Sequence, residues 1–194
     1  THGLGPVSTM LDINRGNRMV HLTGEIDAGL EGLRVGVPSN YFFDGLDSEI
    51  ETIVRAAVDA LVMLGGEQVQ VELPSVESLA AAQLGILTLE AYHNVVEATG
   101  GEITRVNPTL QARLQGGMDE AMRPGETLAV ALGRLRGELD DALASYRRAT
   151  GNVDILATPV LQRYPPRIEL ATSDYQWMPR LTRPFNGSHQ PVVS

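Results

Sequence analysis

The strand–helix–strand pattern between residues 33 and 73 constrains the fold more than any other stretch of this sequence. The segment LRVGVP, residues 33–38, is short, rich in valine and closed by proline, which is typical of a strand. Residues 48–64 carry apolar side chains at helical spacing, and valines alternate with polar residues in QVQVELP, residues 68–74. Because a helical crossover of this length usually joins parallel strands, the pattern predicts an α/β fold.

Capping signals and glycine pairs divide the rest of the chain into elements. Ser48 and Glu51 match a capping box for the first helix, and Gly65-Gly66 supplies its end. Asn107 is a good N-cap, and the proline after it suits a first helical turn. The further predicted elements are helices over residues 75–98, 107–117 and 126–150, and a buried strand over residues 153–160.

The chain is expected to form a single domain over residues 1–194, in which residues 1–32 are an irregular lead-in. Residues 161–190 are rich in proline and predict a loop. Loops that leave the carboxyl ends of strands often build the functional site of α/β folds. The chain closes on PVVS, residues 191–194, which has the pattern of a buried strand.

The inventory of charged and reactive residues excludes several functional classes. With a net charge of -9, the chain is not expected to bind nucleic acid. All 15 basic residues are arginine, so the chain offers no lysine for a Schiff base or a phosphate loop, and cysteine chemistry is absent. No apolar run approaches the roughly 20 residues that span a bilayer, and no secretory signal is visible. The default expectation is a cytoplasmic chain with no membrane partner and no cofactor.

The histidines give little sign of a metal site. His21, His93 and His189 lie in regions expected to be structured, but none has a partner at metal-ligand spacing, so no metal is expected. His93 lies beside Glu90 and Glu97 on a predicted helix. Pairing with a carboxylate at the surface is favoured over an acid–base role for this residue.

The other charged residues also favour structural roles. Asp140 and Asp141 are neighbours on a helix, so their carboxylates point apart instead of facing across a cleft. Arg134 and Arg136 lie on different faces of the same predicted helix. A surface role is favoured for both, with binding of an anion in a pocket as the alternative.

Five segments, taken in order, resemble those of the amidase signature family. They are GPVS at residues 5–8, LEGLRVGVP at 30–38, LGGEQV at 64–69 with LP at 73–74, VDILATP at 153–159, and TRPFN at 182–186 with QP at 190–191. Each segment alone is weakly specific, but the ordered set spans nearly the whole chain. The resemblance implies an α/β/α sandwich built on a large mixed sheet.

The same resemblance implies that catalysis lies elsewhere. The family hydrolyses amides with a Ser–Ser–Lys triad upstream of the GP segment, and this chain has neither a lysine nor a GGSSGG stretch. No residue here is therefore expected to be catalytic, and the missing N-terminal half of the fold is an expected partner. Thr158 and Phe185 are expected to line the pocket for a small-molecule amide substrate, with core packing as the alternative for Phe185.

Two departures from the family pattern stand out. Residues 10–28 are compressed, and His189 stands where the family usually has glycine in a tight turn. Because a side chain disfavours such a turn, an altered backbone is expected at His189.

Three functional hypotheses remain. The leading one is the C-terminal part of an amidase-family hydrolase that cleaves a carboxamide C–N bond, with this segment supplying sheet scaffold and pocket loops. The second is a degenerate, non-catalytic amidase-like module that binds or scaffolds, and the third is an unrelated α/β binding domain. A truncated fold would expose sheet edges, so we expect marginal stability or self-association as a homo-oligomer.

Overall fold

The computed structural model describes residues 29–167 and 177–193. Contacts divide the chain into two units, Thr1–Leu30 and Glu31–Ser194, and nearly all of the first unit lies outside the described residues. The GPVS segment, His21, the compressed residues 10–28 and nearly all of the expected lead-in fall there. The single-domain expectation therefore stays a prediction, and the fold below is that of the second unit.

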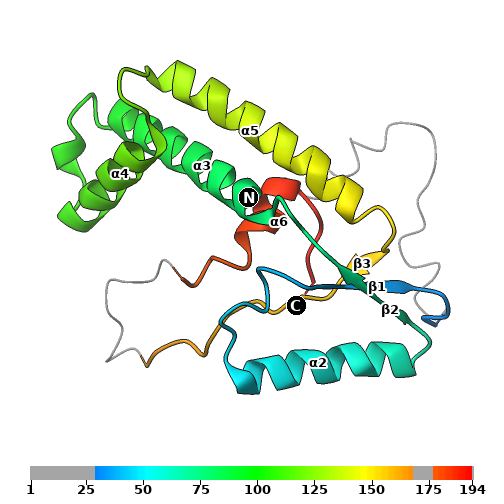
Figure 1. Cartoon of the computed structure of the whole chain (residues 1–194). Helices are drawn as coiled ribbons and strands as arrows, with labels where there is room; N and C mark the ends of the chain where they lie inside the picture. Colours follow the sequence, from blue (N-terminus) through cyan, green and yellow to red (C-terminus); the bar gives the residue numbers. More distant parts are fainter. Residues whose placement is uncertain (1–28, 168–176, 194) are drawn as a thin grey trace, which may run out of the picture. The chain divides into compact units, whose positions relative to one another are not determined.

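The sheet has three strands, β1 (Arg34–Pro38), β2 (Glu67–Val71) and β3 (Ile155–Leu156), in the order β2-β1-β3 (Figure 1). Both pairs are parallel, which confirms the predicted crossover and the α/β class. The mixed sheet that the resemblance implied does not appear in the described residues. β3 is also shorter than the predicted strand over 153–160, because its ladder with β1 covers only Val35 and Gly36.

Helix α2 (Ser48–Met63) links β1 to β2 and covers one face of the sheet (Figure 1). Its N-cap is Asp47, whose carboxylate accepts a hydrogen bond from the Glu49 N–H at 2.9 Å, so the prediction that Ser48 caps this helix is wrong by one residue. The glycines end the helix as predicted, with Gly65 in a left-handed conformation. Much of its predicted apolar face is uncovered, because Ile53 is 56% exposed.

Three further helices lie on the other side of the sheet (Figure 1). They are α3 (Val76–Ala98), α4 (Pro108–Ala121) and α5 (Leu128–Ala149), and a short 3₁₀ turn, η1 (Ile103–Arg105), was not predicted. Asn107 caps α4 as predicted, accepting from the Leu110 N–H at 2.9 Å. α4 continues past the predicted stop at Gly116-Gly117, because Gly117 is where α4 approaches Thr88 of α3. None of the described helices is long and apolar enough to cross a bilayer.

Two apolar clusters hold the layers together, and only the larger one reaches the sheet. The larger one joins the end of β1 and β2 to the start of α3 and the second half of α5, and contains Tyr41, Phe42, Val71, Leu73, Val76, Leu79, Ala80, Ala142, Leu143, Tyr146 and Leu181. The smaller one joins Leu89 of α3 to Ala131 and Leu135 of α5. The predicted apolar stripe of α5 is confirmed, because Ala131, Leu135, Ala142, Leu143 and Tyr146 are buried in these clusters.

The C-terminal segment differs from its predicted structure in two ways. Residues 183–188 form a helix, α6 (Arg183–Ser188), where a loop was predicted. Pro184 lies in the first turn of this helix, where its fixed φ is favourable. Gly187 lets the helix pack against Leu79, whose Cδ2 would lie 2.9 Å from an added Cβ. The expected buried strand over residues 191–194 is wrong for its described part, since residues 191–193 are irregular and Val193 is 98% exposed.

His189 ends α6 in the left-handed conformation, with φ of 56° and ψ of 25°. The tight turn is therefore kept, and the histidine adopts it, so the expected change of backbone does not occur. We expect His189→Gly to raise the free energy of unfolding by about 0.5–1 kcal/mol, because glycine populates this conformation without a steric penalty. Urea unfolding of the two proteins measures the difference, and a loss of stability would show that the exposed imidazole makes a stabilising contact.

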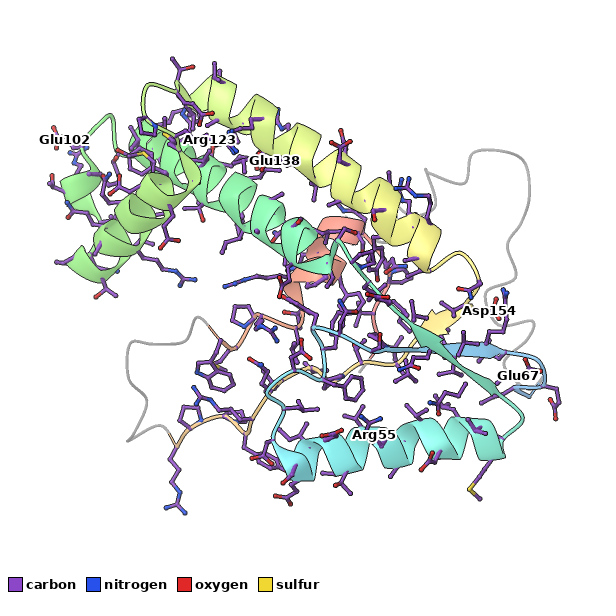
Figure 2. The ribbon with its side chains drawn as sticks, viewed as in Figure 1. Arg55, Glu67, Glu102, Arg123, Glu138 and Asp154 are labelled. Carbon is purple, nitrogen blue, oxygen red and sulfur yellow. The ribbon has the colours of Figure 1, made fainter. Side chains whose placement is uncertain are left out.

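An ion pair joins two of the family-like segments at the amino end of the strands. The Arg34 side chain donates from Nε and Nη2 to the two carboxylate oxygens of Asp154, at 3.1 and 3.0 Å, and the Arg34 backbone N–H donates to Asp154 at 2.8 Å. Figure 2 shows Asp154 at the same end of the sheet as Glu67, the register partner of Arg34. The pair fixes the start of β3 beside β1.

This ion pair predicts an acid-sensitive step in stability. The hydrogen bonds from Arg34 lower the pKa of Asp154 to about 2, below its ordinary value of 3.8. Because the folded-state pKa is the lower one, the stabilisation is present above about pH 4 and is lost as the pH falls toward 2. In Asp154→Asn, the free energy of unfolding should therefore fall less steeply between about pH 4 and 2 than in the parent chain. Asp59→Asn, at an exposed position of α2, should leave this slope unchanged. Equal slopes for Asp154→Asn and the parent chain would contradict the assignment.

Candidate functional site

The parallel strands end at one edge of the sheet, and this carboxyl edge is the candidate site. Pro38 of β1 is in register with Val71 of β2, and Gly36 with Leu156 of β3. The loops after all three strands therefore leave from the same edge. In open α/β sheets this is where ligands bind, because loops from adjacent strands converge there.

A polar clamp fixes the loops after β1 and β2 to each other. The Asn40 side-chain amide donates to the Leu73 carbonyl at 3.0 Å, and its carbonyl oxygen accepts from the Leu73 N–H at 2.9 Å. The Ser39 N–H donates to the Val71 carbonyl at 2.8 Å. The two loops are thereby held as an extension of the sheet, which gives the site a rigid floor.

Tyr41 and Arg180 join this floor to the C-terminal segment. The Tyr41 hydroxyl donates to the Arg180 carbonyl at 2.8 Å, and Arg180 Nη1 donates to the Tyr41 carbonyl at 2.9 Å. The Arg180 guanidinium lies 4.2 Å from the centroid of the Tyr41 ring, a cation–π contact. Tyr41 itself has φ of 64°, and the Asp44 carboxylate accepts from its N–H at 2.8 Å. Such strained, over-determined backbone is common at ligand sites.

Two cations lie near the Tyr41 hydroxyl. Burial raises the pKa of Tyr41 above its ordinary value, and Arg180 and Arg183 act in the opposite direction. The phenol is therefore neutral at physiological pH and serves as a hydrogen-bond donor. The Arg180 guanidinium and the Asp44 carboxylate thus both contact Tyr41 at this edge.

The structure places both predicted pocket residues on segments that belong to this edge. Thr158 is half-buried two residues after β3, and its side chain makes no hydrogen bond to a described residue. Phe185 lies on α6, packs against the larger apolar cluster and has its ring centroid 5.6 Å from that of Phe42. No ring contact or hydrogen bond joins Thr158 to Phe185 among the described residues. Pocket lining stays a prediction for both.

Sequence reasoning missed the residues that organise this edge. Asn40, Tyr41 and Arg180 were not singled out, although the SNY tripeptide directly follows a predicted strand that ends in proline. The position of a polar or aromatic residue just past a parallel strand was the available signal. Arg180 gave no signal, because its contact with Tyr41 joins residues 139 apart.

His93, Arg134 and Arg136, three of the charged residues considered earlier, are each paired with a carboxylate. His93 lies 4.0 Å from Glu97, which confirms the surface pairing favoured for it. Arg136 is exposed and binds Glu90 at 3.1 Å, which confirms the surface role favoured for it. The surface role is wrong for Arg134, whose side chain is 17% exposed and lines a groove, where it binds Glu126 and Glu138 at 2.8 and 3.3 Å. Figure 2 shows Arg123 and Glu138 beside each other where α4 meets α5. Within the described residues, no group of three His, Asp or Glu could hold a metal ion.

An open groove of about 1730 Å³ along α3, between α4 and α5, is a second concave surface. Small side chains line much of it, including Ala81, Gly85 and Ala91. Its charged lining residues include Arg123 and Arg134, which both pair with Glu138. The others are Arg113, Glu120, Asp141 and Arg183. The carboxyl edge stays the candidate site, because loops from adjacent parallel strands converge there.

The chain is similar in sequence and in fold to known amidases and related enzymes. An amidase of Pseudomonas putida is 36% identical over 136 residues, covering 69% of this chain and 27% of that protein. The 2-amino-5-chloromuconic acid deaminase of Comamonas testosteroni is 31% identical over 148 residues, covering 72% and 29%. A crystal structure of an amidase superposes with a TM-score of 0.68 at 19% identity, covering 82% of this chain and 37% of that one.

The chain thus spans about a quarter to a third of the curated relatives' length. The model of the Amidase family matches residues 8–192, nearly all of the chain. The chain belongs to the Amidase family.

Proposed function

We propose that this chain is the C-terminal part of an amidase-family hydrolase that cleaves a carboxamide C–N bond. The match of the family model over residues 8–192 carries the proposal. In it, the strands of this chain continue into a larger mixed sheet of an α/β/α sandwich, and the carboxyl edge walls the pocket of a small-molecule amide. Thr158 and Phe185 line that pocket.

The catalytic groups lie outside these residues in this proposal. The family resemblance implies a Ser–Ser–Lys triad, and the chain has no lysine among its 15 basic residues. The part of the fold that carries the triad is the partner of the described sheet. The uncovered apolar side chains of α2, among them Ile53 and Leu64, are consistent with a further packing partner.

The alternative is a non-catalytic amidase-like module that binds or scaffolds. Sequencing the DNA immediately upstream of the codon for Thr1 distinguishes the two proposals. A frame that continues into a GSSG segment and a lysine supports the enzyme, and a stop codon or promoter supports the module.

An assay on a broad panel of amides then tests the proposal directly. We expect the 194-residue chain to release no ammonia or amine, and the product of the uninterrupted frame to hydrolyse amides in a reaction that a serine-reactive inhibitor stops. The 194-residue chain serves as the matched control, because it contains the whole carboxyl edge without the triad. Inhibitor-sensitive turnover by that chain alone would refute the proposal that the catalytic groups lie outside it.

A further inference from the structure

Arg180 is held differently from Arg34 and Arg134. Arg34 and Arg134 are half-buried, and each pairs with a carboxylate at 3.0 and 2.8 Å. Arg180 is half-buried as well, but in the described part of the chain no carboxylate lies within ion-pair distance of it. A partly desolvated cation without a counter-charge is unfavourable unless another group supplies the charge.

The guanidinium is nevertheless fixed in position. It rests on the Tyr41 ring at 4.2 Å, and one of its N–H groups donates to the Tyr41 carbonyl at 2.9 Å. Tyr41 is only 5% exposed and is anchored in turn by Asp44 and by its own hydroxyl bond to the Arg180 carbonyl. A guanidinium has five N–H donors, so this arrangement orients the fork and leaves donors for a ligand.

The charge lies where the proposed substrate pocket is. Tyr41 lies in the loop after β1 at the carboxyl edge, and the Arg180 guanidinium stacks on its ring there. The ring of Phe42 beside it packs against Phe185 at 5.6 Å. The edge therefore combines an apolar wall with an oriented cation.

The geometry points to Arg180 as the binding group for a carboxylate on the amide substrate, so that the enzyme prefers half-amides of dicarboxylic acids over neutral amides. The inference rests on the proposed amidase function and narrows its substrate class. A carboxylate fits because its two oxygens match two parallel N–H groups of one guanidinium. A single fork on a chain of net charge -9 is poorly suited to a polyphosphate.

The test uses the product of the uninterrupted frame and two matched sets of substrates. The first set is the half-anilides of malonic, succinic and glutaric acid, and the second replaces the free carboxylate of each by an uncharged carboxamide. Aniline release gives kcat/KM for both. We expect Arg180→Gln to lower kcat/KM about 10- to 100-fold for the best half-anilide and less than about threefold for its neutral analogue. Arg180→Lys should keep part of the preference, because it keeps the charge without the fork.

Arg55→Gln is the matched control. Arg55 also lies over an aromatic ring, that of Phe43 at 4.9 Å, but it pairs with Glu51. The Arg55→Gln variant should keep the parent's kcat/KM for both sets of anilides. An equal fall for charged and neutral anilides in Arg180→Gln would show that Arg180 only fastens Tyr41 and would overturn the inference.

A binding measurement separates this inference from the proposed function. Calorimetric titration with succinanilate, its carboxamide analogue and inorganic phosphate needs no turnover. If no amide is hydrolysed but succinanilate binds and Arg180→Gln abolishes binding, the proposed function fails and the carboxylate site stands. If amides are hydrolysed but the three probes bind alike or not at all, the carboxylate site fails and the amidase stands.

Discussion

Replacing Phe42 by alanine is expected to lower the free energy of unfolding by about 3–5 kcal/mol. The Phe42 side chain is fully buried, with its ring 5.2 Å from that of Tyr41 and 5.6 Å from that of Phe185. It therefore connects the loop after β1 to α6. Alanine would leave a cavity at the point where these two parts of the carboxyl edge meet.

Urea unfolding followed by circular dichroism measures this effect, with Phe43→Ala as the matched control. Phe43 is the next residue, but it is half-buried and lies under the exposed Arg55. Its replacement should cost clearly less, because fewer contacts are lost. Similar losses for the two variants would contradict the assignment of Phe42 to the centre of the core.

The adjacent glycines Gly116 and Gly117 are expected to respond in opposite directions to alanine. Gly116 has open space where a Cβ would lie, so Gly116→Ala should stabilise the chain by about 0.8–1 kcal/mol through helix propensity. At Gly117 an added Cβ would overlap the Cγ2 of Thr88, whose hydroxyl is bound to the Leu84 carbonyl at 2.9 Å. Thr88 is thus held in place and cannot turn away freely.

The difference in stability between these two variants measures the cost of overpacking at Gly117, because both variants gain the same helix propensity. We expect Gly117→Ala to be less stable than Gly116→Ala by about 1–3 kcal/mol. Thermal unfolding of both proteins in the same buffer measures this difference. Equal stability would mean that α4 does not approach α3 at Gly117.

Elements with strong local signals were predicted well from the sequence. The parallel β1–α2–β2 unit was predictable because periodicity, a closing proline and a glycine pair all indicate the same structure. The errors have tertiary causes. α4 extends beyond its glycines because Gly117 contacts Thr88, and α6 was missed because its short helix depends on packing against Leu79.

The candidate site was predicted only in part. The edge itself follows from the direction of the strands, and the family resemblance directed attention to Thr158 and Phe185. The link between Tyr41 and Arg180 was not predictable, because it depends on a left-handed backbone at a tyrosine and on a contact across most of the chain. His189 likewise adopts a left-handed conformation at a position where the family pattern has glycine.

The central claim is that this chain walls the pocket of an amidase whose nucleophile lies elsewhere, and a serine-reactive fluorophosphonate tests it most directly. After labelling of the uninterrupted product, tandem mass spectrometry identifies the modified residue. The account predicts one adduct, on a serine outside this 194-residue sequence, and none on the separate chain. An adduct on a serine within these residues, such as Ser39 at the carboxyl edge, would contradict it.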